Sequence, residues 1–400
     1  MNIPKLRFKE FTDEWKQTPL KNIIYSNIIE APKPTTDYIR LGIRSHCKGT
    51  FHELVKIENI LSADKMYIVP KNNLILNITF AWEQAIAITD DNDEGKYISN
   101  RFPTFAFKDN QLPTFYKYII PQKRLKYDLN VASPGGAGRN RVLNKKLFLS
   151  IPVNIPLLKE QEKIAKFLST VDKKITNLEN TITSLENQKK GLLQQIFSQK
   201  LRFKDENGNN YPIWEKKKLH ELCFKIGDGL HATPKYIDSG SNYFINGNNL
   251  FNKKILVNEL TKKVSNNELS KYYIPLDNNS ILISLNGTIG NLAFYNNESI
   301  ILGKSCGYIN LKDNILKEFI YYYLLQSKIQ LYFYKELTGT TIKNLSLSSL
   351  KNTPIRLPCL EEQTKIANFL SAFDRKLDNQ KAQLEHWQQI KKGLLQQMFV

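Results

Sequence analysis

The sequence predicts an α+β fold in which two pseudo-repeated globular α/β regions are joined by two long antiparallel coiled-coil helices. Three observations lead to this prediction. The chain of 400 residues contains an internal repeat. A nearly constant segment in each copy carries apolar residues at coiled-coil spacing, and the variable part of each copy mixes strand-like with helix-like text. This length accommodates two or three domains of ordinary size.

The repeat is clearest when the chain is shifted by 202 residues. LLKEQEKIAKFLSTVDKKI (157–175) then falls on CLEEQTKIANFLSAFDRKL (359–377), and KKGLLQQ occurs both at 189–195 and at 391–397. About half of the roughly forty paired positions are identical, which chance does not produce. We therefore expect a first globular region, a first helix, a second globular region and a second helix, at 1–155, 156–200, 201–357 and 358–400.

The two constant segments have the pattern of long helices. Their apolar residues follow alternating steps of three and four, which form the seam of a coiled coil. Pro156 and Pro358 precede the segments, and acidic residues near Glu160 suit the positive end of the helix dipole. A helix from Glu160 to Phe197 is about 57 Å long at roughly 1.5 Å per residue. We expect the helices to pair within the chain, and the candidates for this pairing and for partner-subunit contact are Ile164, Leu168, Val171, Ile175, Gly191, Leu192, Ile366, Leu370, Phe373, Leu377, Gly393 and Leu394.

Two of these candidates are glycines inside the predicted helices, where glycine costs about 1 kcal/mol relative to alanine. Gly191 and Gly393 hold the same place in the two copies. This repetition indicates a close contact with the other helix or with a partner, and a tolerated kink is the alternative.

The variable regions predict strands as well as helices. NNLILNITFAW and NNSILISLNGTIGNLAFY have the β-branched residues and Gly/Asn punctuation of strands and turns. LKEFIYYYLLQSKIQLYFYKEL (316–337) instead has apolar and aromatic residues at helical spacing, which predicts a core-packing helix. Its first half resembles LPTFYKYII (112–120), so we expect both regions to share one α+β plan.

The charge of the chain points to an anionic partner. Lys and Arg number 57 against 38 Asp and Glu, a formal net charge of +19. Such an excess is costly in self-repulsion unless an anion compensates it, so nucleic acid is the leading partner. A generally basic proteome is the alternative, and a membrane surface ranks third because no terminal basic amphipathic segment carries aromatic residues on its apolar face. Without an apolar run of roughly 18–20 residues or a secretory signal, we expect a cytoplasmic protein that contacts no membrane.

Sequence motifs for catalysis or metal binding are lacking. The four cysteines are widely separated, and the five histidines have no ligand spacing. PGGAGRNR (134–141) lacks the third glycine of a dinucleotide-binding loop, and the P-loop, HExxH and GxSxG patterns do not occur. We therefore expect no metal site and no catalytic residue, so that the chain catalyses nothing by itself.

Basic and amide side chains gather at matching places in the two copies. One short segment of the first copy carries Arg40, Arg44, His46 and Lys48, and the equivalent segment of the second carries Asn246, Asn248, Asn249, Lys253 and Lys254. Arginine can bridge guanine O6 and N7, whereas asparagine can bridge adenine N6 and N7, so two readers of different DNA sequences would differ in this way. Solvated loop residues are the alternative. A second basic set precedes each long helix and suits phosphate contacts. The candidate DNA-binding residues are Arg40, Arg44, His46, Lys48, Arg101, Arg139, Arg141, His231, Lys235, Asn246, Asn248, Asn249, Lys253, Lys304 and Lys343.

Two variable regions, each closed by a segment like NTPIRLPCLEEQTKIANFLSAFDRKL and by KKGLLQQ, resemble the specificity subunit of a type I restriction–modification system. The similarity covers essentially the whole chain, although the first copy has LLKEQEKI where the family usually has two acidic residues before Gln. It implies two target-recognition domains that each read half of a split double-stranded DNA site, with the helices as spacer. It also implies two adenine methyltransferase subunits and translocating restriction subunits, which bring S-adenosylmethionine, ATP and Mg, while this chain binds no cofactor directly.

Geometry leads to the same mechanism. Two DNA-recognition domains on a rigid helical spacer prefer half-sites on one face of the duplex, about 34–36 Å or a multiple apart. Because the two domains differ, we expect the site to be bipartite and asymmetric. The alternatives are a stand-alone coiled-coil DNA-binding scaffold or transcriptional regulator, which would bind DNA without a methyltransferase partner, and a single-chain enzyme acting on nucleic acid.

Overall fold

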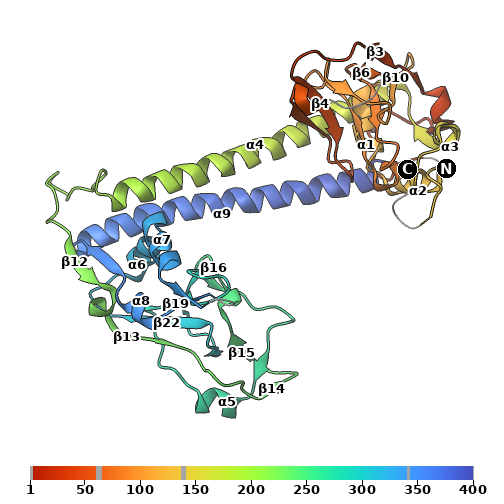
Figure 1. Cartoon of the computed structure of the whole chain (residues 1–400). Coiled ribbons are helices and arrows are strands. Elements are labelled where there is room, and N and C mark those ends of the chain that lie inside the picture. The colour runs from red at the N-terminus through yellow and green to blue at the C-terminus, as the bar shows by residue number, and fades with distance from the viewer. Residues whose placement is uncertain (1–2, 60–64, 137–140, 340–342, 400) are drawn as a thin grey trace. The chain divides into compact units, whose positions relative to one another are not determined.

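The computed structural model describes residues 3–59, 65–136, 141–339 and 343–399. The chain forms two compact units, which we call unit 1 (1–179 with 382–400) and unit 2 (180–381). Each unit therefore contains one globular region together with parts of both long helices (Figure 1).

Unit 1 is built on a four-stranded antiparallel sheet with the order β2-β10-β7-β8. Its apolar face packs against helices α1 to α3, with Phe105, Phe115 and Phe148 fully buried between them. A separate two-stranded ladder, β1-β11, leads into the long helix. The elements of this framework are β1 (Lys16–Pro19), η1 (Leu20–Asn22), β2 (Ile24–Ser26), β7 (Leu74–Leu76), η3 (Ala81–Glu83), β8 (Ile86–Ile88), β10 (Thr104–Phe107), α1 (Pro113–Ile119), α2 (Lys123–Val131), α3 (Lys145–Ser150) and β11 (Pro152–Ile155).

Unit 2 repeats the four-stranded sheet, the two-stranded ladder and the three helices of this framework. Its sheet has the order β13-β22-β19-β20, and its ladder is β12-β25. The sheet packs against α6 to α8, with Phe319, Tyr322 and Phe333 fully buried. The elements are β12 (Glu215–Lys218), η4 (Leu219–Leu222), β13 (Cys223–Asp228), β19 (Ser280–Ser284), β20 (Leu292–Phe294), β22 (Cys306–Leu311), α6 (Lys317–Leu324), α7 (Ser327–Lys335), β23 (Leu337–Thr338), β24 (Asn344–Leu345), α8 (Leu347–Lys351) and β25 (Pro354–Leu357).

The second sheet of each unit differs between the copies. In unit 1 it is five-stranded with the order β3-β6-β9-β4-β5, whereas in unit 2 it is four-stranded with the order β14-β18-β15-β21. The framework is thus duplicated and the attached sheet is not. The elements in this part are β3 (Ile29–Ala31), β4 (Tyr38–Ile43), β5 (Thr50–Val55), η2 (Ile57–Asn59), β6 (Met66–Ile68) and β9 (Tyr97–Ile98) in unit 1, and β14 (Tyr236–Ile237), β15 (Asn242–Ile245), η5 (Gly247–Asn249), β16 (Leu250–Phe251), β17 (Lys254–Ile255), β18 (Lys263–Val264), α5 (Asn266–Lys271) and β21 (Ile300–Leu302) in unit 2.

One expected helix, 316–337, is in fact two helices, α6 and α7. The break lies at Gln326, whose backbone is extended with φ −58° and ψ 141°. The side-chain amides of Gln326 and Gln330 donate to the carbonyl oxygens of Tyr323 and Leu324 at 2.9 and 2.8 Å. These side-chain bonds add to the backbone bonds at the end of α6, so the chain turns without a proline or glycine.

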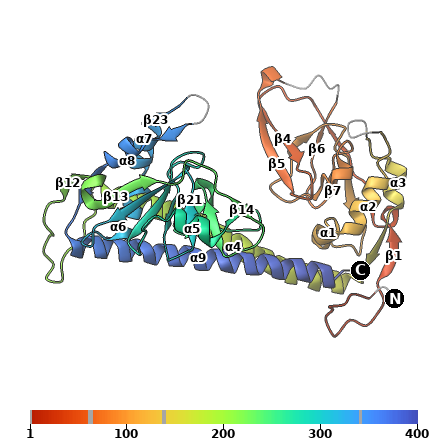
Figure 2. The same ribbon diagram turned by 90° about the horizontal axis from the view of Figure 1, so that it is seen from below.

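The two long helices are α4 (Leu158–Phe197) and α9 (Leu360–Gln397), and they lie side by side in both views (Figures 1 and 2). In unit 2, Lys189 pairs with Asp374, and Lys381 pairs with Glu186 at 2.6 Å. As the residue number rises along α4, the residue number of the partner on α9 falls, so the two helices are antiparallel. In unit 1, Lys391 pairs with Asp172 at 2.8 Å in the same sense. No helix in the described part of the chain is long and apolar enough to cross a membrane.

The repeated KKGLLQQ segments end inside the globular cores. In unit 1, Leu394, Leu395, Met398 and Phe399 pack into the core cluster that surrounds Trp15. The corresponding residues of α4 pack into the core of unit 2, where Phe197 contacts Trp214 with ring centroids 6.3 Å apart. Each unit core therefore contains the end of the helix that belongs to the other repeat. This packing explains why the segment occurs twice.

The start of each helix is held by a buried ion pair. Glu362 is fully buried and accepts from Arg202 at 2.7 and 3.1 Å and from Trp214 Nε1 at 2.9 Å. In unit 1, Arg7 and Trp15 make the same contacts with Glu160. These arginines come from the repeated KLRFK text at 5–9 and 200–204. The buried acidic residues thus pair with partly buried arginines, a role that the dipole argument did not foresee.

The glutamine beside each of these acids joins helix and globular region. Gln363 Oε1 accepts from Leu316 N at 3.0 Å, where α6 begins, and its amide donates to Pro358 O at 3.0 Å. Gln161 makes the equivalent bonds to Leu112 and Pro156, both at 3.0 Å. The EQ pair of the constant segment is therefore a structural connection between the helix and its own repeat.

Candidate nucleic-acid interface

Loops from five separate parts of the sequence meet at one edge of unit 2. Gly247 N donates to Ser305 Oγ at 2.8 Å, and Thr288 Oγ1 donates to Gly247 O at 3.0 Å. A side chain at Gly247 would collide with Ser284 Oγ, since a Cβ there lies 2.2 Å from that atom. Further backbone bonds attach Leu230 to Leu302 and Leu345 to Leu285. We call these loops, 228–231, 245–249, 284–290, 302–306 and 343–345, the unit 2 loop cluster.

The equivalent loops meet in unit 1. His46 N and Cys47 N donate to the carbonyl oxygens of Glu83 and Gln84 at 2.7 and 2.9 Å. Ile78 N donates to Arg101 O at 3.0 Å, in the way that Leu285 N donates to Ser305 O in unit 2. We call the loops 44–49, 77–84, 99–102 and 141–143 the unit 1 loop cluster. Candidate residues that are far apart in the sequence thus lie on neighbouring loops in both units.

Several candidate side chains are engaged within the fold. Arg141 donates to Ser133 O at 2.9 Å and Asn130 O at 2.6 Å, and its guanidinium lies over the Trp82 ring. These contacts cap the end of α2, where a cation is favourable to the helix dipole. Arg40 is paired with Glu53 at 2.6 Å.

The same holds for three candidates of unit 2. Asn246 Oδ1 accepts from Ser305 Oγ, and the Asn249 amide spans Asn246 N and Leu256 O. Lys253 Nζ reaches Asp374 at 2.6 Å. The sequence identified these side chains by their chemical type but could not reveal their internal partners.

Other candidates are exposed on the clusters or beside them. Lys343 lies with Nζ 5.3 Å from the Tyr334 ring centroid, and His231 pairs with Asp228 at 2.7 Å. Arg44 lies over the Phe51 ring and donates to Thr50 O. Arg139 falls outside the described residues. The exposed candidates that we retain as proposed DNA contacts are Arg44, His46, Lys48, Arg101, His231, Lys235, Asn248, Lys304 and Lys343.

Next to the candidate His46, the structure adds a group of residues that sequence reasoning missed. A cavity of about 490 Å³ beside the unit 1 loop cluster is lined by basic, amide and aromatic side chains, together with one glutamate. Tyr127 is 61% exposed there. The spacing of the basic residues along KRLKYDLN was the available signal, since it places them on the exposed side of α2. The lining residues are His46, Trp82, Glu83, Lys123, Lys126, Tyr127 and Asn130.

The candidates for helix pairing divide into two groups. Ile164, Leu168, Ile366 and Leu370 are buried in the unit cores, so their contacts are with the globular regions as well as with a helix. Val171 and Leu377 are buried farther along the helices, and Ile175, Leu192, Phe373 and Leu394 are half-buried.

The two helix glycines make no close helix–helix contact. A Cβ built at Gly191 or Gly393 meets nothing within 4 Å among the described residues, so this part of the expectation is wrong. Across those same residues, no group of three or more His, Cys, Asp and Glu side chains is placed to hold a metal ion.

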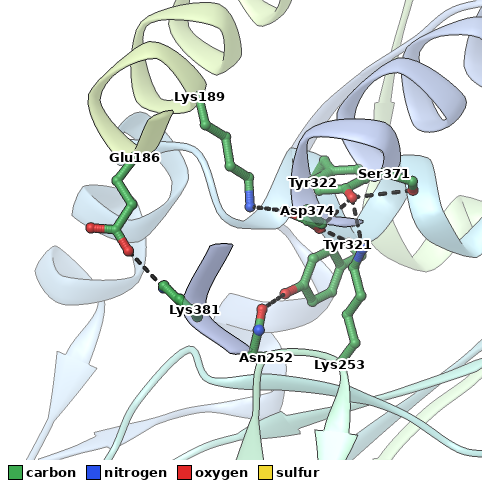
Figure 3. A network of polar contacts seen from close by, with 9 residues as sticks. All are labelled: Glu186, Lys189, Asn252, Lys253, Tyr321, Tyr322, Ser371, Asp374 and Lys381. Atoms are coloured by element: carbon green, nitrogen blue, oxygen red, sulfur yellow. Dashed lines mark hydrogen bonds and ion pairs between the residues drawn. The ribbon is translucent and has the colours of Figure 1, made fainter. Parts of the chain in front are cut away.

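In each unit, equivalent side-chain contacts of one aspartate join the two long helices, and we call this set of contacts the clasp. Asp374 accepts from Tyr322 OH at 2.6 Å and pairs with Lys189, the first lysine of KKGLLQQ (Figure 3). In unit 1, Asp172 accepts from Tyr118 OH at 2.9 Å and pairs with Lys391 at 2.8 Å. Burial alone would raise the pKa of Asp374, but hydrogen bonds from Lys189, Lys253 and Tyr322 outweigh it and hold that pKa below its ordinary value. Its contribution to stability is present at neutral pH and is lost only as the pH falls through this lowered pKa.

Two duplicated units that each contain a loop cluster, within a chain of net charge +19, define a tandem-repeat protein whose charge suits a polyanionic partner. The sequence model of the type I restriction modification DNA specificity domain matches residues 17–187 and again 212–386. The chain belongs to this family, the non-catalytic specificity subunits that recognise the DNA target of type I restriction enzymes.

Individual relatives agree with this assignment. The chain is 26% identical over 377 residues to the type I restriction enzyme MjaVIII specificity subunit of Methanocaldococcus jannaschii, covering 91% of this chain and 84% of that one. Its fold is similar to the crystal structure of a type I restriction-modification S subunit from M. genitalium, with a TM-score of 0.60, 16% identity and coverage of 100% and 99%. A chain from a structural study of assembly and conformational transition of the type I R-M system matches with a TM-score of 0.55 and 17% identity over 95% and 96% of the two chains.

Lys304 provides a direct test of the unit 2 loop cluster. It is exposed between β21 and β22, and Lys312 is exposed at the opposite end of β22. We expect Lys304→Ala to weaken DNA binding similarly for all sequences and to reduce the slope of log affinity against log salt by about 1, because one phosphate contact is lost. Lys312→Ala is the matched control and should leave the slope unchanged. Equal slopes for Lys304→Ala and the wild type would remove Lys304 from the interface.

Proposed function

We propose that this chain recognises a bipartite, asymmetric DNA site and directs adenine methylation and restriction by partner subunits in the cytoplasm. Residues 1–155 and 201–357 act as the two target-recognition domains, and each reads one half-site. The paired helices α4 and α9 set the gap between the half-sites. The observation that carries this proposal is the duplication itself: the framework sheet is repeated strand for strand, whereas the attached sheet differs in order and strand number.

The contrast between a repeated framework sheet and a differing attached sheet supports two separate recognition domains. The scaffold is the same in both units, whereas the surface that it carries differs. The same four-stranded framework holds a loop cluster in both units, with equivalent backbone bonds at Leu285 and Ile78. Side chains differ on those loops, so the two half-sites should differ in sequence.

The partners follow from the proposed activity. Two methyltransferase subunits would bind S-adenosylmethionine, and the restriction subunits would use ATP and Mg for translocation. The chain itself then contributes sequence recognition and the positions of its partners. Gly191 and Gly393, with open space beside them, remain proposed contacts with these subunits.

The test is to co-express the chain with the methyltransferase subunit encoded beside it, in a host without other adenine methylation, and to map N6-methyladenine by single-molecule sequencing. We expect a split asymmetric motif with a fixed gap that disappears when this chain is omitted. A soluble complex that adds no methylation would instead favour a stand-alone DNA-binding scaffold or regulator.

A further inference from the structure

One contact of Asp374 in the unit 2 clasp is made with a residue outside the two long helices. Besides Lys189 and Tyr322, Asp374 binds a second cation, Lys253, which comes from the turn between β16 and β17 (Figure 3). Lys253 Nζ lies 2.6 Å from Asp374 Oδ2 and 2.7 Å from Tyr322 OH. It also lies 4.6 Å from the Tyr322 ring centroid and 5.1 Å from that of Tyr321. A charge-assisted bond in such a half-buried site is stronger than an exposed one.

The turn that carries Lys253 is held in an uncommon backbone conformation. Asn252 and Lys253 have φ values of 45° and 69°, a left-handed region that residues other than glycine rarely adopt. Lys253 N donates to Leu292 O at 3.2 Å, and Phe294 N donates to Lys253 O at 3.1 Å. The turn is thus fixed to the framework strand β20 through its backbone and to helix α9 through its side chain.

This turn is continuous with residues 246–249 of the unit 2 loop cluster, which we call the reading loop. Asn249 Nδ2 donates to Leu256 O at 2.9 Å, and Leu256 N donates to Asn249 O at 2.7 Å. The loop and the turn therefore form one closed segment from Asn246 to Leu256. The exposed Asn248 belongs to the same closed segment as Lys253.

Unit 1 fastens its equivalent loop in a different way. Cys47 Sγ and Gln84 Nε2 both donate to Ile120 O, at 3.4 and 3.1 Å, which ties the loop to the end of α1. The clasp at Asp172 joins helix to helix and to Tyr118. Among the described residues, the ion pair between a long helix and the turn beside the reading loop is thus found in unit 2.

From this asymmetry we propose that Asp374 and Lys253 are positioning residues for base recognition by unit 2: Asp374 on the spacer helix holds Lys253, and Lys253 sets the position of the reading loop 246–249. This inference rests on the proposed function. It assigns Lys253 to an internal connection, in place of the DNA contact that its charge first suggested. It also makes one constant-segment aspartate a determinant of one half-site.

The experiment uses the full chain in complex with its methyltransferase subunit. The wild-type complex first supplies the methylated motif, and a failure at that stage would refute the proposed function before any variant is made. Duplexes carrying one wrong base pair in either half-site then measure discrimination, as the ratio of their Kd to that of the cognate duplex. Asn248→Ala, in the reading loop itself, identifies the half-site that unit 2 reads.

We expect Lys253→Met and Asp374→Asn each to reduce discrimination within that half-site by about tenfold, while discrimination in the other half-site is unchanged. The double variant should resemble either single variant because both remove one connection. Lys253→Arg should restore discrimination, since it keeps a cation at Asp374. Asp172→Asn, the matched change in unit 1, should leave the unit 2 half-site unaltered.

The competing explanation is that Lys253 binds a DNA phosphate. In that case Lys253→Met would weaken binding equally for every duplex and lower the salt slope by about 1, and Asp374→Asn would not reproduce its effect. That result would overturn the proposal, as would unchanged discrimination in both variants or an equal loss in both half-sites. Lys253→Met changes a surface turn and keeps the side-chain length, so the test does not depend on Asp374→Asn being stable.

Discussion

Insertion of three heptads into α4 between Glu179 and Asn180, and of three into α9 between Lys381 and Ala382, is expected to lengthen the recognised gap by about ten base pairs and to leave both half-sites unchanged. Twenty-one helical residues span about 32 Å, which is close to the roughly 34–36 Å of one turn of B-DNA. Whole heptads preserve the seam. The two insertion points lie between the Glu186–Lys381 and Asp172–Lys391 pairs, so both of these ion pairs keep their partners. Methylome mapping of the variant complex measures the gap.

Two companion variants make this prediction sharper. A single heptad in each helix adds about 10 Å, or about three base pairs, which turns one half-site by roughly 100° around the duplex. We expect that variant to lose methylation at any gap. Insertion into α4 alone would move Lys189 away from Asp374 and should lower stability. If the variant with three heptads in each helix keeps the wild-type gap, or changes a half-site, the helices do not set the spacing.

Replacement of Glu362 by glutamine is expected to lower the free energy of unfolding by about 3 kcal/mol, because it leaves the Arg202 guanidinium without its buried counter-charge. Glu362 is fully buried and serves three hydrogen bonds, from Arg202 and Trp214. Urea denaturation followed by circular dichroism measures the loss.

Its neighbour in the sequence is the control. Glu361 is exposed, so Glu361→Gln should leave the free energy of unfolding unchanged within the error of the measurement. Replacement of both partners, as Glu362→Leu with Arg202→Met, should recover much of the loss because no charge remains buried. Unfolding of Glu362→Gln at the wild-type urea concentration would show that the ion pair contributes nothing to the fold.

Local pattern was sufficient to predict the long helices and the repeat. The heptad spacing from Ile164 onward and the prolines that precede the helices are local features of the sequence. Helices α4 and α9 begin two residues after these prolines. The expected helix at 316–337 was wrong in one respect, since its break at Gln326 depends on side-chain bonds to carbonyls of the preceding turn. The spacing of apolar residues along the sequence does not predict such hydrogen bonds.

The candidate site was predicted less completely than the fold. Charge and type placed Lys304, Lys343 and Asn248 on loops, and backbone bonds then showed that these loops are neighbours. The same reasoning chose Arg141 and Lys253, whose cations are satisfied by Asn130 O and by Asp374. A lysine in a loop looks the same in the sequence whether its partner is a phosphate or a carboxylate far along the chain.

The sequence by itself determined that the protein has two copies of one plan, that each copy ends in a long helix, and that the chain carries an excess of positive charge. These properties depend on residue identity and on spacing over a few helical turns. Only the tertiary structure decided that each KKGLLQQ end packs in the core of the unit formed by the other repeat, that the buried Glu160 and Glu362 pair with partly buried arginines, and that Asp374 binds Lys253 of the β16–β17 turn. Those pairings join residues more than a hundred positions apart, and burial and hydrogen bonding select them only when the chain has folded.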